Sequence, residues 1–92
     1  MRDFLLHNGQ DNVGVVVRDV KSGEPLTGAT IDRSSVFQVT AGQDIPLGHK
    51  IALKDFKPGE TVVKYGEDIG KVVAEIRAGE HVHVHNLKTK RW

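Results

Sequence analysis

The chain has 92 residues, with 13 Lys and Arg against 12 Asp and Glu and a formal net charge of +1. This length suits one domain with a modest core, and it argues against a deep active site enclosed by this chain alone. The near-zero charge argues against nucleic-acid or membrane-surface partners. The absence of cysteine excludes disulfides and thiolate metal sites. No apolar run suits a signal peptide or a membrane span, so a cytoplasmic location is expected.

Short β-strands are predicted along most of the chain, because β-branched and alternating apolar residues recur and no window shows helical spacing. The predicted strands lie at residues 13–17, 35–40, 49–53, 61–65, 69–74 and 81–87. Residues 20–34 are polar and contain glycine, so a mobile loop with at most one weak strand is expected there. Together these features predict an all-β barrel or folded ribbon.

A corner motif recurs in the connections, with the order acid, apolar, base, any residue, Gly, Glu. Three copies lie at residues 19–24, 55–60 and 75–80, and a looser copy lies at 44–49. We expect each copy to form a tight turn with its apolar residue buried beneath it and its glycine at positive φ. The acid is expected to cap N–H groups of its own turn. The uneven spacing of the copies indicates a reused corner, not a solenoid.

Histidines alternate at positions 81, 83 and 85, so a regular strand over 81–87 would place them on one face. Imidazoles in this arrangement can bind one metal ion or one anion, and they can transfer protons near neutral pH. A solvated strand face without function is the alternative. Asn86 falls on the opposite face of a regular strand, where it can bind a substrate group or mark a turn.

Two further candidates, His49 and Lys50, follow the glycine of the looser corner and point to opposite strand faces. The alternative for them is a partly buried histidine and a solvated lysine. Tyr65 can offer a hydroxyl group to a ligand, with core packing as the alternative. No catalytic triad, zinc-protease motif, dinucleotide motif or phosphate loop is present. The residues therefore predict a binding module, or one part of an active site that another protein completes.

A family resemblance rests on four segments in order, at residues 11–15, 45–53, 64–70 and 79–86. The sequences GHKIAL within the second and HVHVHN within the fourth are specific in combination. The chain resembles the N-terminal SAF domain of the altronate/galactarate dehydratase family over nearly its whole length. The resemblance implies a small all-β domain of β-clip type that spans residues 1–92, with 86–92 as a basic tail. That tail is free or anchors a partner through Trp92.

The resemblance also implies a lyase. In this family the domain is fused ahead of a large lyase domain or made as a separate small subunit, and the end of the chain soon after Asn86 suggests the small subunit. Its expected reaction is β-elimination from a 2-hydroxy acid. The substrates implied are (2R)-sulfolactate, giving pyruvate and sulfite, and altronate, giving a 2-keto-3-deoxy sugar acid. Length and ending resemble the sulfolactate type most closely, and the HVHVHN segment argues against galactarate.

Site residues follow from the matched motifs. His83 and His85 are implied as catalytic residues and candidate metal ligands, and His49, Lys50 and Asn86 as substrate-binding residues. Because alternate residues face opposite ways, a bulge or a two-sided cleft is required to unite them. The large subunit is expected to hold most of the site, including a divalent metal, with iron as the first candidate. The alternatives are a stand-alone SAF module that binds sugar acids or other anions, and a metal-holding adaptor without catalysis.

Overall fold

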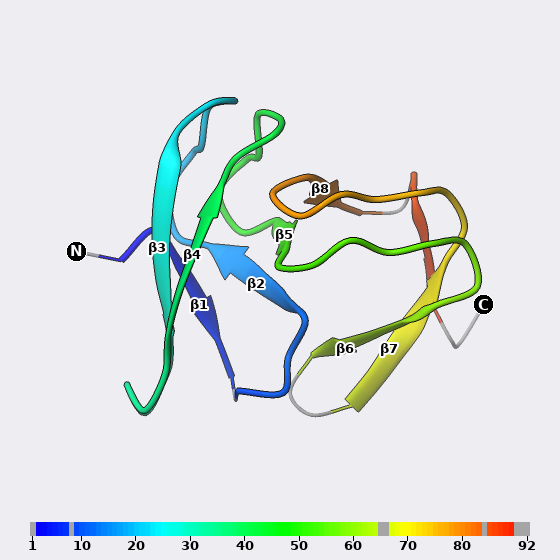
Figure 1. Cartoon of the computed structure of the whole chain (residues 1–92), viewed down its shortest axis with the longest axis horizontal. Helices are drawn as coiled ribbons and strands as arrows, with labels where there is room; N and C mark the ends of the chain where they lie inside the picture. Colours follow the sequence, from blue (N-terminus) through cyan, green and yellow to red (C-terminus); the bar gives the residue numbers. More distant parts are fainter. Residues whose placement is uncertain (1, 8, 65–66, 84, 90–92) are drawn as a thin grey trace.

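The computed structural model describes residues 2–7, 9–64, 67–83 and 85–89. Nine strands and their connecting turns make up this part of the chain (Figure 1), and no helix there could cross a membrane. The strands are β1 (Phe4–Leu6), β2 (Val13–Val16), β3 (Pro25–Thr30), β4 (Val36–Thr40), β5 (Lys50–Ala52), β6 (Thr61–Lys64), β7 (Glu67–Val72), β8 (His81–Val82) and β9 (Leu87–Thr89). The predicted all-β fold is confirmed.

The strands form two sheets, a six-stranded one ordered β4-β3-β1-β2-β5-β8 and a three-stranded one ordered β6-β7-β9. The larger sheet curls into a half-barrel. In Figure 1, β1 to β4 lie on one side and β6, β7 and β9 on the other, with β5 and β8 between them. All strand pairs are antiparallel except β1 with β3. The strands between the two sides are therefore the ones that can join groups from both.

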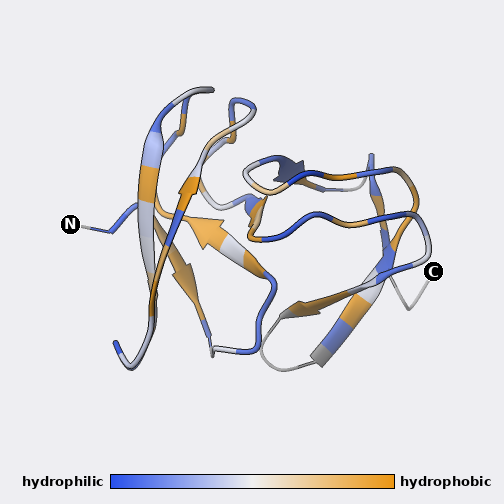
Figure 2. Ribbon diagram, viewed as in Figure 1, coloured by the Kyte–Doolittle hydropathy of each residue, from blue (hydrophilic) through white to orange (hydrophobic). Residues whose placement is uncertain are grey.

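Two hydrophobic cores stabilise the fold, and β2 and β5 contribute to both. Val16 and Ile51 belong to the first core, whereas Val13 and Ala52 belong to the second. All four side chains are fully buried. In Figure 2, β1 and β2 carry the hydrophobic colour over most of their length, whereas β8 is drawn in the hydrophilic colour. The two cores thus meet along β2 and β5, next to the polar strand β8.

The four corner motifs form tight turns, as predicted. Their glycines all have positive φ, with values of 91°, 86°, 93° and 90° at Gly23, Gly48, Gly59 and Gly79. Their apolar residues are buried and pair in twos across the molecule. Val20 forms a bridge with Ile45, and Phe56 forms one with Ile76. The first pair belongs to the first core and the second pair to the second core.

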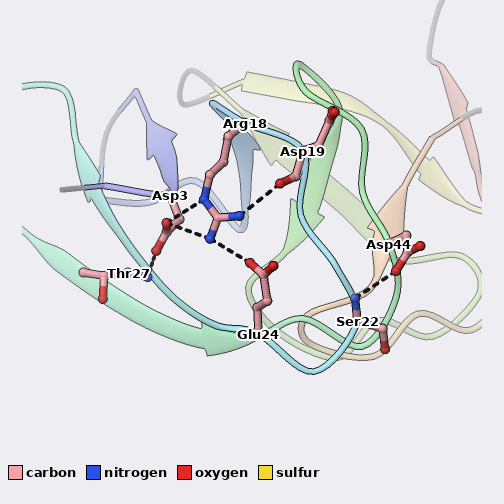
Figure 3. A network of polar contacts seen from close by, with 7 residues as sticks. All are labelled: Asp3, Arg18, Asp19, Ser22, Glu24, Thr27 and Asp44. Carbon is pink, nitrogen blue, oxygen red and sulfur yellow. Dashed lines mark hydrogen bonds and ion pairs between the residues drawn. The ribbon is translucent and has the colours of Figure 1, made fainter.

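In three of the four motifs the opening acid caps the partner corner, which corrects the expectation that it caps its own turn. The backbone N–H of Leu47 donates to Asp19 over 2.8 Å. That of Ser22 donates to Asp44 over 2.9 Å (Figure 3). The two corners of the first core therefore cap one another. This reciprocal bonding could not be found from a motif read as an isolated turn.

The corner pair of the second core has one cross-corner cap of the same kind. The backbone N–H of Ala78 donates to Asp55 over 2.8 Å. The equivalent position in the other corner is Pro58, which has no N–H to offer the facing Glu75. Glu75 instead lies 3.8 Å from Arg77 in an exposed ion pair. The second corner pair thus has one cross-corner cap where the first has two.

In the second corner pair, the final glutamate of each motif caps its own turn. The backbone N–H of Lys57 donates to Glu60 over 2.6 Å, and that of Arg77 donates to Glu80 over 2.8 Å. The hydrogen bond from Lys57, followed by the one from the side chain of Lys54, lowers the pKa of Glu60. Each corner of the first pair therefore receives one capping carboxylate, whereas in the second pair the corner at 75–80 receives two and the corner at 55–60 receives one.

Arg18 links the N-terminal segment to the first corner (Figure 3). Its guanidinium donates to Asp3 over 3.1 Å and to the carbonyl of Asp19 over 3.0 Å, and it lies 2.7 Å from Glu24. Asp3 also accepts the backbone N–H of Thr27 over 2.8 Å. That backbone hydrogen bond is the main reason for the lowered pKa of Asp3, with Arg18 adding to it. The network fixes the start of β1 against β3.

The expectation of a mobile loop over residues 20–34 was wrong, because β3 lies inside the larger sheet between β1 and β4. Leu26 and Ala29 are buried there, and Gly28 leaves room for the ring of Phe4. A Cβ atom at Gly28 would lie only 2.1 Å from that ring. The polar composition of this segment concealed a strand whose packing depends on a residue without a side chain.

The predicted basic tail also needs correction. Leu87, Lys88 and Thr89 form β9, which pairs with β7 and extends the smaller sheet. Leu87 is buried in the second core. Trp92 and the two residues before it lie outside the described residues, as does Tyr65.

Candidate functional site: a histidine cluster

The histidines meet because β5 and β8 pair antiparallel. In their register Ile51 lies opposite His81, so His49, directly before β5, falls opposite His83. Residues two apart on a strand share a face. The ladder therefore places His49, His81 and His83 on the same side of the sheet, on two segments distant in the sequence.

The three imidazoles are in contact. The Nδ1 atom of His49 lies 2.9 Å from the Nε2 atom of His81, and the His49 and His83 rings stack with centroids 4.3 Å apart. One ring nitrogen from each of the three lies within 4.8 Å of the others. All three side chains are partly buried, whereas His85 is exposed at the margin, its ring centroid 5.3 Å from that of His81. We call His49, His81 and His83 the histidine cluster.

His81 is the central member, and the site residues predicted from sequence omitted it. The alternation of histidines and the HVHVHN segment both include it, but only His83, His85 and Asn86 of that segment were assigned as site residues. Burial, followed by the nearby charges of His49, His85, His83 and Lys50, lowers the pKa of His81 to about 4. The same kinds of cause lower the pKa of His83. His81 is therefore neutral at neutral pH, the form in which imidazole binds metals.

Asn86 ends the histidine strand, so the predicted strand over 81–87 is shorter than expected. Its side-chain oxygen accepts the backbone N–H of His83 over 2.9 Å, and its side-chain nitrogen donates to the carbonyl of His81 over 2.7 Å. The backbone N–H groups of Asn86 and Leu87 both donate to the carbonyl of His83. This confirms the turn-forming alternative. A substrate contact by Asn86 stays a prediction, but these bonds already make it a positioning residue for the cluster.

Comparison with known proteins now adds to this geometry. The model of the altronate/galactarate dehydratase SAF domain matches residues 2–90. The chain belongs to this family. It is 53% identical over 91 residues to the (2R)-sulfolactate sulfo-lyase subunit alpha of Chromohalobacter salexigens, covering 98% of this chain and 97% of that protein.

Two other relatives place this SAF domain in context. The (2R)-sulfolactate sulfo-lyase subunit alpha of Paracoccus pantotrophus is 61% identical over 59 residues, which are 64% of this chain and 88% of that protein. The altronate dehydratase of Bacillus subtilis is 40% identical over 89 residues, which are 97% of this chain but 17% of that protein. The SAF domain thus matches whole proteins of the first kind and a small part of the second.

Lys50 lies on the other side of the SAF sheet from the histidine cluster. It pairs with Val15 of β2 and Val82 of β8, one position out of phase with the histidines. The predicted alternation between His49 and Lys50 is therefore retained. Its charge still contributes to the lowered pKa of His81 and His83. A substrate contact by Lys50 stays a prediction.

The cluster offers three neutral nitrogen donors, a set that suits divalent transition metals such as zinc, iron and nickel. Among the described residues, no carboxylate joins this metal-binding group. This group shares only His83 with the pair predicted from sequence as metal ligands, and metal binding by His83 and His85 stays a prediction. The donor chemistry of the SAF domain fits the divalent metal expected for the family.

Proposed function

We propose that this SAF domain is the small subunit of a lyase and acts with a larger partner subunit. The observation that carries the proposal is the 53% identity to a (2R)-sulfolactate sulfo-lyase subunit alpha over almost the full length of both chains. The match to altronate dehydratase covers only 17% of that enzyme. This supports a division of labour in which another chain supplies the rest of the active site.

The proposed reaction is β-elimination of sulfite from (2R)-sulfolactate. A base removes the proton from the carbon that carries the hydroxyl group, and that electron pair forms the new carbon–carbon double bond. The bond to sulfur breaks, and sulfite leaves with its electron pair. The resulting enol takes up a proton on carbon and becomes pyruvate. Altronate dehydration follows the same pattern with water as the leaving group, and it is the second substrate to test.

The residues of this chain contribute proton transfer and positioning. His85, exposed at the margin of the cluster, is the proposed proton-transfer residue, and His83 is proposed to act from within the cluster as a ligand of the metal. His81 is a poor base for this task, since a pKa of about 4 is far below the working pH that a general base should match. A divalent metal would supply Lewis-acid stabilisation of the developing enolate.

The test is co-expression of the chain with the large subunit and measurement of sulfite and pyruvate from sulfolactate, with altronate offered separately. Loss of a proton-transfer residue costs roughly 10²–10⁴-fold in rate, so His85→Gln should lower kcat by that amount. His7→Gln is the matched control, because His7 lies outside the cluster. A complex that releases neither product, or specific anion binding by a chain that takes no partner, would favour the stand-alone binding module instead.

A further inference from the structure

We propose that His49, His81 and His83 form a divalent-metal site that belongs to this chain itself. The expectation from the family resemblance was that the large subunit holds most of the metal site. The structure brings three ligand atoms together within one chain, from the two segments that pair as β5 and β8. Only the role assigned to the metal rests on the proposed function, because the site itself rests on geometry.

The spacing of the donor atoms suits a metal. Nitrogen ligands lie about 2.1 Å from a zinc ion, so two of them stand roughly 3.0–3.4 Å apart across right-angled or tetrahedral geometry. The nitrogens of His49 and His81 already lie 2.9 Å apart. The greatest separation within the cluster is under 4.8 Å. A ring movement of roughly 1–2 Å brings the third nitrogen to bonding distance.

Backbone hydrogen bonds hold the ligands in place. The N–H of His81 donates to the side chain of Gln43 over 2.9 Å, and the N–H of His83 donates to that of Asn86 over 2.9 Å. The β5–β8 ladder fixes the third ligand across from them. The site is thus organised before any metal arrives, and binding requires little ordering of the backbone.

The charge of the site determines which further ligands can complete the coordination of the metal. Three neutral imidazoles leave the full charge of a divalent ion uncompensated, and no carboxylate belongs to the described group. Three protein ligands with open positions are typical of catalytic metal centres. An anionic 2-hydroxy acid can fill those positions through its carboxylate and hydroxyl oxygens. This assignment rests on the proposed function and matches the chemistry of its substrate.

The test is metal binding by the isolated full-length chain, without partner or substrate. Titration with Co²⁺ should give one equivalent and the visible d–d absorption of a nitrogen-ligated ion, with Zn²⁺ affinity measured by calorimetry. His49→Gln, His81→Gln and His83→Gln should each weaken binding at least tenfold. His85→Gln and His7→Gln are the matched controls and should stay within about twofold of wild type, a difference of under 0.5 kcal/mol.

The outcomes separate cleanly. Circular dichroism in the presence of chelator confirms that each variant is folded before affinity is compared. Failure of the isolated chain to bind either ion, or equal losses in the cluster variants and in His7→Gln, overturns the proposal. A chain that binds one metal but yields a complex without elimination activity supports the site and overturns the proposed function. An active complex whose small chain binds no metal supports the proposed function and overturns the metal site.

Discussion

The Nδ1 atom of His49 lies 2.9 Å from the Nε2 atom of His81, although 32 residues separate them in the sequence. At this distance one nitrogen donates a proton and the other accepts it, or both bind the same metal ion. With both rings protonated, neither nitrogen could accept, and two positive charges would lie side by side. The pair therefore links the stability of the β5–β8 junction to pH and to metal.

The metal-free chain should lose stability as pH falls from about 6.5 towards 4. The pKa of His81 is about 4 in the folded state against 6.5 as its usual value. The unfolded chain therefore binds more protons in this window, and the free energy of unfolding falls with decreasing pH. The charged and titratable groups near His81 are His49, His85, His83 and Lys50, and the charge of each disfavours protonation of His81.

Urea unfolding at pH 7 and pH 5, with chelator present, measures this effect. His81→Gln should show a smaller difference between the two pH values than wild type, because glutamine does not titrate. Carboxylates with lowered pKa, such as Asp3 and Glu60, take up protons mainly below this window. Identical pH dependence in both proteins would rule out His81 as the group responsible.

Asp55→Ala should destabilise the fold by about 0.5–2 kcal/mol, the usual cost of losing a side-chain cap. It leaves the backbone N–H of Ala78 without its acceptor. Glu75→Ala is the matched control in the facing corner, where Pro58 has no N–H to cap, and it should change stability by less than about 0.5 kcal/mol. Denaturant unfolding of both variants checks the asymmetry, and equal losses would contradict it.

Gly79→Ala should be far more damaging than Gly59→Ala, although φ is 90° at one glycine and 93° at the other. Left-handed backbone alone costs an alanine roughly 1–2 kcal/mol. At Gly79 the new Cβ would also lie 2.0 Å from the carbonyl oxygen of Thr40, whereas at Gly59 it meets nothing within 4 Å. Thermal unfolding should show a modest drop in Tm for Gly59→Ala and a much larger drop for Gly79→Ala. Similar Tm values would mean that the corner near Thr40 relaxes without cost.

Asn86→Ala should cost about 1–3 kcal/mol, because it leaves the N–H of His83 and the carbonyl of His81 without partners in a partly buried turn. It should also weaken Co²⁺ binding about tenfold, the low end of losses for groups that orient metal ligands. Asn86→Asp keeps the acceptor but loses the donor, so an intermediate loss is expected. Lys88→Ala, at an exposed position in β9, serves as the control. Unchanged Co²⁺ affinity in Asn86→Ala would remove its positioning role.

Much of the fold could be predicted from local patterns. The corner motif gave the positive φ of its glycines and the burial of its apolar residues, since both follow from the turn itself. The cross-corner bonds of Asp19 and Asp44 could not be predicted in this way, because they depend on which corners meet. The strand β3 was expected only as a weak strand in a mobile loop, because a polarity pattern cannot show that Gly28 makes room for the buried ring of Phe4.

The candidate site was predicted in part. The alternation of histidines put several on one face, and the family motif pointed to His49 and His83, which do meet. His81 was missed because its importance comes from the register between β5 and β8, a long-range property. Asn86 was assigned through the motif alone, whereas its bonds to the turn decide its position.

The two corner pairs have a consequence for how the chain folds. Val20 meets Ile45 within the first half, and Phe56 meets Ile76 within the second, so each half can close its own loop at a modest entropic cost. The histidine cluster forms only when β8 docks on β5, whose residues serve both cores. That docking continues the register of the Phe56–Ile76 bridge, so a partly folded chain with its second half closed already brings the three histidines together. Metal bound at the proposed site would therefore report that the second half of the chain has closed, independently of the first core.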